Sequence, residues 1–175
     1  MWQRGVAIRA AVVVAVAAIA AGKYAQGFPS FGPERRGAPV AAFTRIDDKK
    51  INKRSGIYKP DVVLVLDASL IGLVNVLEGL KPGGKLIVNT HKTPDEICQA
   101  LNYSGTLALV DGTGIARKEM GVPIANTTMI GALLKVTGIL DLDVMKEPIE
   151  HRFGRIAQKN LNAMKRAYDE IKIYN

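Results

Sequence analysis

Short apolar runs recur along the chain from residue 61 onward. They cover residues 62–66 (VVLVL), 85–89 (KLIVN) and 107–110 (LALV), and aliphatic side chains dominate each of them. Such runs are typical of strands buried on both faces of a parallel sheet. Elsewhere the apolar positions take a helical spacing. This spacing predicts helices over residues 70–80, 113–120, 126–136, 141–152 and, at the C-terminal end, about 155–172.

One more helix has a clear start signal at residues 93–96 (TPDE). Thr93 is a suitable cap, Pro94 fits the first turn and Glu96 completes a capping box. Strands that alternate with helices predict an α/β fold, doubly wound, with a mostly parallel sheet flanked by helices. We see no internal repeat and no convincing boundary, so we expect a single α/β domain over residues 1–175.

Polar residues follow the predicted strands at the edge where parallel sheets place their sites. Asp67 follows the first strand, His91 lies just after the second and Asp111 follows the third. These side chains would form an acid and base group if the sheet brought them together. Asp67 and Asp111 are also natural helix caps, and capping is the more ordinary interpretation.

An uninterrupted apolar run covers residues 10–21, and Arg4 and Arg9 precede it. The run is shorter than the roughly 20 residues that a transmembrane helix needs. A basic start, an apolar centre and small residues after it are typical of a secretory signal. An Ala- and Val-rich helix buried in an α/β domain fits the same residues. One hypothesis is therefore a stand-alone exported α/β binding protein with a cleaved N-terminal signal.

Residues 22–39 hold four glycines and three prolines, a density that predicts a long loop. Its aromatic residues Tyr24, Phe28 and Phe31 indicate that contacts order it. A strand is predicted next, over residues 40–46. Within the loop, Arg35 and Arg36 are adjacent, and arginine forks bind carboxylates or phosphates bidentately. An Arg–Glu pair that pins the loop to its own domain is an equally good interpretation.

The excess positive charge that gives the chain its net charge of +8 lies in residues 1–60. Residues 1–60 carry eleven Lys or Arg against three acids, whereas residues 61–175 carry thirteen of each sign. A local basic region favours a phosphate-bearing ligand, a nucleic acid or an acidic protein surface. A nucleic-acid binder that uses residues 35–59 is the weakest of these hypotheses, because the chain lacks a basic stretch interleaved with aromatic residues.

The composition also limits the chemistry that this chain performs alone. The single cysteine, Cys98, excludes an internal disulfide and an iron–sulfur cluster ligated by this chain, which needs about four cysteines. With only His91 and His151, a zinc site is not expected. Neither G-x-G-x-x-G nor G-x-x-x-x-G-K-[ST] is present, which disfavours a self-contained nucleotide site.

Three blocks of sequence resemble a known family. Residues 22–40 (GKYAQGFPSFGPERRGAPV) are similar to the gamma subunit of 2-oxoacid:ferredoxin oxidoreductases, most closely the pyruvate (pyruvate synthase) type. Residues 110–116 (VDGTGIA) and 121–132 (GVPIANTTMIGA) agree, as does the tail with Arg152-Phe153, Lys159-Asn160 and Ala167-Tyr168. The resemblance covers roughly residues 20–175.

The resemblance implies a subunit of an enzyme that oxidatively decarboxylates a 2-oxoacid, forms an acyl-CoA and reduces ferredoxin, reversibly. It implies a complex that uses thiamine diphosphate, Mg²⁺, [4Fe-4S] clusters and coenzyme A. These belong with alpha, beta and ferredoxin-like delta subunits, so that this chain binds no cofactor alone and is not catalytic by itself. The implied location is the cytoplasm, with no cleaved signal and with neither nucleic acid nor membrane as a partner.

The resemblance also implies which residues meet a partner subunit or lie close to coenzyme A. These are Phe31, Gly32, Glu34, Arg35, Arg36, Gly37, Asn126 and Thr127; none is expected to be catalytic or to bind a metal. In one respect the sequence departs from the family. Members start with a strand and a Gly-Arg-Gly-Gly-Gln-Gly-type turn, and here only Gly5 fits that turn. The first strand is therefore expected to be missing or atypical.

Overall fold

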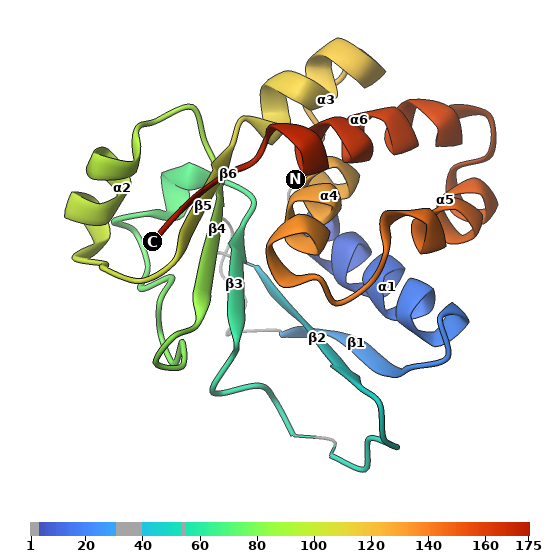
Figure 1. The fold of residues 1–175 in the computed structure, drawn as a ribbon, viewed down its shortest axis with the longest axis horizontal. Helices are drawn as coiled ribbons and strands as arrows, with labels where there is room; N and C mark the ends of the chain where they lie inside the picture. Colours follow the sequence, from blue (N-terminus) through green and yellow to red (C-terminus); the bar gives the residue numbers. More distant parts are fainter. Residues whose placement is uncertain (1–3, 31–39, 54) are drawn as a thin grey trace.

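A computed structural model describes residues 4–30, 40–53 and 55–175, the side chains of residues 4–9 excepted (Figure 1). The first element is helix α1 (Arg4–Ala20). A two-stranded antiparallel hairpin follows, formed by β1 (Tyr24–Ser30) and β2 (Ala41–Asp47). The remaining elements build a layered α/β body around a second sheet.

The second sheet has the strand order β3 (Val62–Val65), β4 (Lys85–Asn89), β5 (Leu107–Val110) and β6 (Lys172–Tyr174). The first three strands are parallel, and β6 pairs antiparallel with β5. The three apolar runs thus form the parallel part of the sheet at almost the predicted bounds. The prediction of a mostly parallel sheet is confirmed.

Helices cover both faces of this sheet (Figure 1). The helices of the α/β body are α2 (Pro94–Leu101), α3 (Gly112–Met120), α4 (Asn126–Thr137), α5 (Lys146–Phe153) and α6 (Ala157–Glu170), with short 3-10 turns η1 (Ala68–Leu70), η2 (Leu142–Met145) and η3 (Gly154–Ile156). Ile87 and Ala108 face α4 and α6, whereas Leu86 and Leu107 face α2. Because alternate strand residues point to opposite faces, one strand serves two apolar layers. The doubly wound α/β class is confirmed.

Helix α1 forms part of a further core layer beyond α4. Val13, Val14 and Ala17 are buried where α1 packs against α4, α5 and η2. The hairpin packs on α1 closely, because a Cβ on Gly27 would lie 2.9 Å from the carbonyl oxygen of Ala11. A helix that is apolar all round is typical of such a sandwiched position. The apolar run is therefore a core helix, and the exported-protein hypothesis gains no support.

Two predicted elements were wrong. The helix expected over residues 70–80 is a series of turns, in which Gly72 and Gly79 have φ angles of +89° and +73°. Positive φ angles are incompatible with a right-handed helix, and glycine adopts them at no steric cost. The loop expected over residues 22–39 begins with a strand instead, because β1 finds a complete partner in β2.

Within the described ranges, α1 is the first element of the chain. No helix in residues 4–30, 40–53 and 55–175 combines the length and hydropathy that crossing a lipid bilayer requires.

Candidate functional site

Six of the eight predicted interface residues, Phe31, Gly32, Glu34, Arg35, Arg36 and Gly37, lie outside the described residues. Their two flanks are well defined. Ser30 at the end of β1 pairs directly with Ala41 at the start of β2. The segment therefore connects the two strands of the hairpin, between the paired residues Ser30 and Ala41.

The other two predicted residues, Asn126 and Thr127, occupy the first turn of α4 and are 5% and 1% exposed. The hydroxyl of Thr127 donates a hydrogen bond of 2.6 Å to Oδ1 of Asn160 in α6. Asn160 donates in turn to the carbonyl oxygen of Ile156 at 2.8 Å. The structure thus places Thr127 within the α4–α6 contact, where it links two helices. Burial of this kind depends on the tertiary packing, so the local sequence carries no signal for it.

The polar residues at the carboxyl edge of the sheet form hydrogen bonds that tie strand ends to helix starts. Asp111 accepts a bond of 2.8 Å from the N–H of Gly114 and caps α3. Asp67 accepts a bond of 2.9 Å from the N–H of Ser69 and caps η1. The capping interpretation of these two carboxylates is confirmed, and His91 beside them is exposed.

Asn89 is the structural centre of this edge, a role that sequence reasoning missed. Its Nδ2 donates to the carbonyl oxygen of Leu66 at 2.9 Å and to the hydroxyl of Thr113 at 2.8 Å. Its Oδ1 accepts from the N–H of Thr113 at 3.1 Å. One amide thereby joins the end of β4 to the segment after β3 and to the start of α3. Its position as the polar last residue of a buried strand was the available signal.

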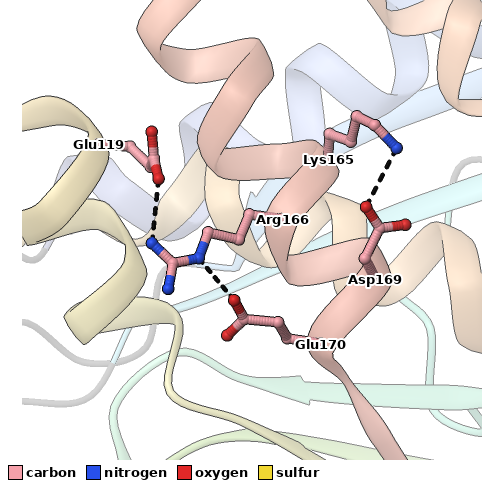
Figure 2. Close-up of polar contacts among 5 residues, drawn as sticks. All are labelled: Glu119, Lys165, Arg166, Asp169 and Glu170. Atoms are coloured by element: carbon pink, nitrogen blue, oxygen red, sulfur yellow. Dashed lines mark hydrogen bonds and ion pairs between the residues drawn. The ribbon is translucent and has the colours of Figure 1, made fainter.

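A cluster of ion pairs fixes α6 against α3 (Figure 2). Arg166 donates from Nη1 to Glu119 at 3.0 Å and from Nε to Glu170 at 2.5 Å. The carboxylates of Glu170 and then Glu119 raise the pKa of Arg166, because both accept hydrogen bonds from its charged form. Among the described residues, the neighbouring Lys165 forms its ion pair with Asp169 of its own helix alone, at 3.0 Å. Arg166 is thus the residue of this cluster that joins two elements.

A largely apolar hollow lies between α1 and α5. Its volume is about 430 Å³, and Val12, Val16, Pro148 and His151 contribute to its lining. Val16 is 48% exposed, and Ile19 on the same helix is 57% exposed. Exposed aliphatic side chains gathered beside a hollow are typical of a surface that contacts another protein.

The described residues include no group of three or more His, Cys, Asp and Glu side chains placed to hold a metal ion. The arrangement that these residues do form is structural: caps, a strand-end amide and two helix–helix links. Among the described residues, the hollow between α1 and α5 is one surface available for recognition.

Comparison with known proteins identifies the family to which this chain belongs. The family model described as pyruvate ferredoxin/flavodoxin oxidoreductase matches residues 5–170. The "pyruvate/ketoisovalerate oxidoreductases common subunit gamma" of Thermococcus kodakarensis is 50% identical over 170 residues, which cover 96% of this chain and 92% of that protein. The "pyruvate synthase subunit PorC" of Methanocaldococcus jannaschii is 48% identical over 166 residues, 94% of this chain and 90% of that protein.

A crystal structure of the pyruvate oxidoreductase subunit PORC from Thermotoga maritima superposes with a TM-score of 0.86. It is 38% identical and covers 97% of this chain, which in turn covers 92% of it. The resemblance drawn from residues 22–40, 110–116 and 121–132 is therefore confirmed. The chain belongs to the pyruvate ferredoxin/flavodoxin oxidoreductase family, in which it is a gamma-type subunit.

Proposed function

We propose that this chain is the gamma subunit of a multi-subunit 2-oxoacid:ferredoxin oxidoreductase that acts on pyruvate. The complex decarboxylates the 2-oxoacid oxidatively, transfers the acyl group to coenzyme A and passes the electrons to ferredoxin; run in reverse, it is a pyruvate synthase. The observation that carries the proposal is 50% identity to a common gamma subunit over 96% of this chain. The whole chain, residues 1–175, acts as one gamma-type domain.

In this proposal the chemistry belongs to alpha, beta and ferredoxin-like delta subunits. They hold thiamine diphosphate, Mg²⁺ and [4Fe-4S] clusters, and thiamine diphosphate supplies the carbanion chemistry of decarboxylation. The cysteine count supports this division, because a [4Fe-4S] cluster takes about four thiolates and this chain contains only Cys98. The carboxylates of Asp67 and Asp111 cap helices, which is a structural use.

In this proposal, the gamma subunit contributes surfaces that contact the other subunits of the complex. We assign the exposed apolar part of α1, around Val16 and Ile19, to a contact with another subunit. An aliphatic patch gains stability when a partner removes it from water, by about 25 cal/mol per Å². The complex works in the cytoplasm, as the family resemblance implies.

We assign a second, charged contact to Arg35 and Arg36. The guanidinium fork suits a carboxylate of a partner subunit or a phosphate of coenzyme A, and the proposal places both arginines at such a position. Replacing Arg36 by Ala then weakens assembly or raises the apparent KM for coenzyme A. An Arg36→Ala complex with unchanged composition and kinetics would contradict this role.

The proposed function is tested by reconstitution. The alpha, beta and delta chains of the source organism are co-expressed with and without this chain, anaerobically. Pyruvate- and coenzyme A-dependent reduction of ferredoxin is then measured in both preparations. The expected result is activity that depends on this chain. Full activity and normal assembly without it would contradict the proposal.

A further inference from the structure

The segment between β2 and β3 carries a dense positive charge. Residues 47–60, here called the cationic arm, hold five basic residues against two acidic ones. In Figure 1 the arm loops away from the body of the molecule beyond the end of β2. Four of its basic residues are exposed lysines, and these are Lys49, Lys50, Lys53 and Lys59.

The acidic residues on and beside the cationic arm are already engaged. Asp48 pairs with Lys23 at 2.6 Å, and this contact holds the pKa of the Asp48 carboxyl below its usual value. Asp61 pairs with Lys81 at 2.6 Å. Asp47 accepts a bond of 2.9 Å from the backbone N–H of Lys49. Within the described part of the chain, none of the four lysines of the arm lies within ion-pair distance of a carboxylate.

Hydrogen bonds tie the first half of the cationic arm to the hairpin. Arg45 of β2 donates from its two terminal nitrogens to the carbonyl oxygens of Lys53 and Ser55, each at 3.1 Å. Gln26 of β1 donates to the carbonyl oxygen of Ile51 at 3.4 Å. Arg45 therefore donates to neutral carbonyl oxygens of the arm, and among the described residues its guanidinium forms no ion pair with a carboxylate.

The second half of the cationic arm is held by close packing. A Cβ on Gly79 would lie 2.1 Å from the carbonyl oxygen of Tyr58, so the two backbones touch. Pro60 accepts a hydrogen bond of 3.1 Å from the N–H of Lys81. The side chain of Tyr58 nevertheless stands 80% exposed. An ordered backbone that presents lysines and one tyrosine loses little conformational entropy on binding, which is the benefit of pre-organisation.

We propose that the cationic arm docks on an acidic surface of a neighbouring subunit of the oxidoreductase complex, an inference that rests on the proposed function. Several exposed lysines on one segment orient a partner and speed its association, although each exposed ion pair alone contributes little. Tyr58 supplies the kind of rigid aromatic contact that protein interfaces favour. A nucleic-acid surface fits less well, because bases stack on several aromatic residues and the arm presents only Tyr58.

Zero-length cross-linking of the purified native complex tests this docking directly. A carbodiimide joins a lysine to a carboxylate only when the two are in contact, and mass spectrometry identifies both residues. We expect links from the lysines of the cationic arm to Asp or Glu of another subunit, fading as the salt concentration rises. Links only to this chain's own acids, links only to added ferredoxin, or no links from the arm would overturn the proposal.

A charge-reversal pair gives a second test. The Lys49→Glu, Lys50→Glu and Lys53→Glu changes are combined in one variant, and Lys118→Glu, Lys159→Glu and Lys172→Glu in a control of equal charge. Thermal unfolding of both isolated chains verifies that they fold. The arm variant should retain the other subunits about tenfold less well than the control at moderate salt. Equal retention in the two variants would overturn the docking of the arm and leave the proposed function standing, whereas wild-type chain that retains no other subunit would overturn both.

Discussion

The hydroxyl of Thr127 in α4 and the side-chain amide of Asn160 in α6 lie 2.6 Å apart, and both residues are almost fully buried. Gly131 and Met164, which lie four residues further along α4 and α6, mark a second contact between the two helices. At Gly131 the backbones approach so closely that a Cβ would come within 1.9 Å of the carbonyl oxygen of Met164. A buried polar pair beside a glycine contact fixes the register of the crossing, because any shift would leave both polar groups unpaired.

Replacing Thr127 by Val should destabilise the folded chain. The change preserves shape but leaves Oδ1 of Asn160 buried without its donor, which costs about 1–3 kcal/mol. The measurement is the free energy of unfolding from denaturant titration. The adjacent Thr128 is the matched control, because its buried hydroxyl has no hydrogen-bond partner among the described residues, and Thr128→Val should be neutral or stabilising. Equal destabilisation by both changes would contradict the role of the bond.

Replacing Arg166 by Gln should lower the midpoint of thermal unfolding. The change removes the charge that Glu119 of α3 and Glu170 of α6 both contact. Lys165→Gln is the matched control, because the one ion pair of Lys165 within the described ranges is with Asp169, one turn along its own helix. The control should have a small effect that salt abolishes. An Arg166→Gln effect no larger than the control would show that the link between α3 and α6 contributes nothing.

The start of α2 should give the chain part of its pH dependence. The backbone N–H and then the hydroxyl of Thr93 donate to the carboxylate of Glu96, which lowers the pKa of that carboxyl. A folded-state pKa below the unfolded value of about 4.3 means that ionised Glu96 stabilises the fold above that pH. The stabilisation is lost as the pH falls through the folded-state pKa.

This contribution is measured as the difference in melting temperature between the wild-type chain and Glu96→Gln across a pH series. The difference should be largest at neutral pH and should shrink below about pH 4.3. A difference that stays constant down to pH 3 would contradict the assigned cause.

The exposed apolar part of α1 should matter for assembly and not for folding. Changing Val16 and Ile19 together to Glu places two charges on a surface that we assign to another subunit. We expect the variant to fold and to lose its partners, because a desolvated unpaired charge is costly. Leu73→Glu is the control, since Leu73 is 74% exposed at a site far from α1 in the sequence. Retention of the complex by the α1 variant would contradict the assignment.

The helices and strands that were predicted correctly are those whose sequence signal comes from neighbouring residues. The parallel strands β3, β4 and β5 and the capped start of α2 were predictable. An aliphatic run and the Thr93–Glu96 capping box both consist of residues that are close in the sequence, so they can be recognised without knowing the fold. Strand β1 was missed because its glycine and proline indicate a loop, and only its pairing with β2 makes it a strand. The false helix over residues 70–80 shows the reverse case, in which apolar spacing was overridden by turns at Gly72 and Gly79.

The residues of the candidate site likewise include some that were predictable from the local sequence and others that were not. The caps made by Asp67 and Asp111 were predictable from their position after apolar strands. The bridging role of Asn89 and the burial of Thr127 depend on which strands and helices become neighbours, which no local pattern encodes. The family, in contrast, was recognisable from the residues 22–40 block, because a long run of specific residue types is more informative than any one periodicity.

The central claim is that this chain works only as one subunit of a 2-oxoacid:ferredoxin oxidoreductase. The most direct measurement is affinity purification of the natively expressed chain under anaerobic conditions, followed by mass spectrometry of everything retained. Our account predicts that this chain is recovered together with thiamine diphosphate-binding and ferredoxin-like subunits. Recovery of the chain alone, or with no subunit of either kind, would contradict it.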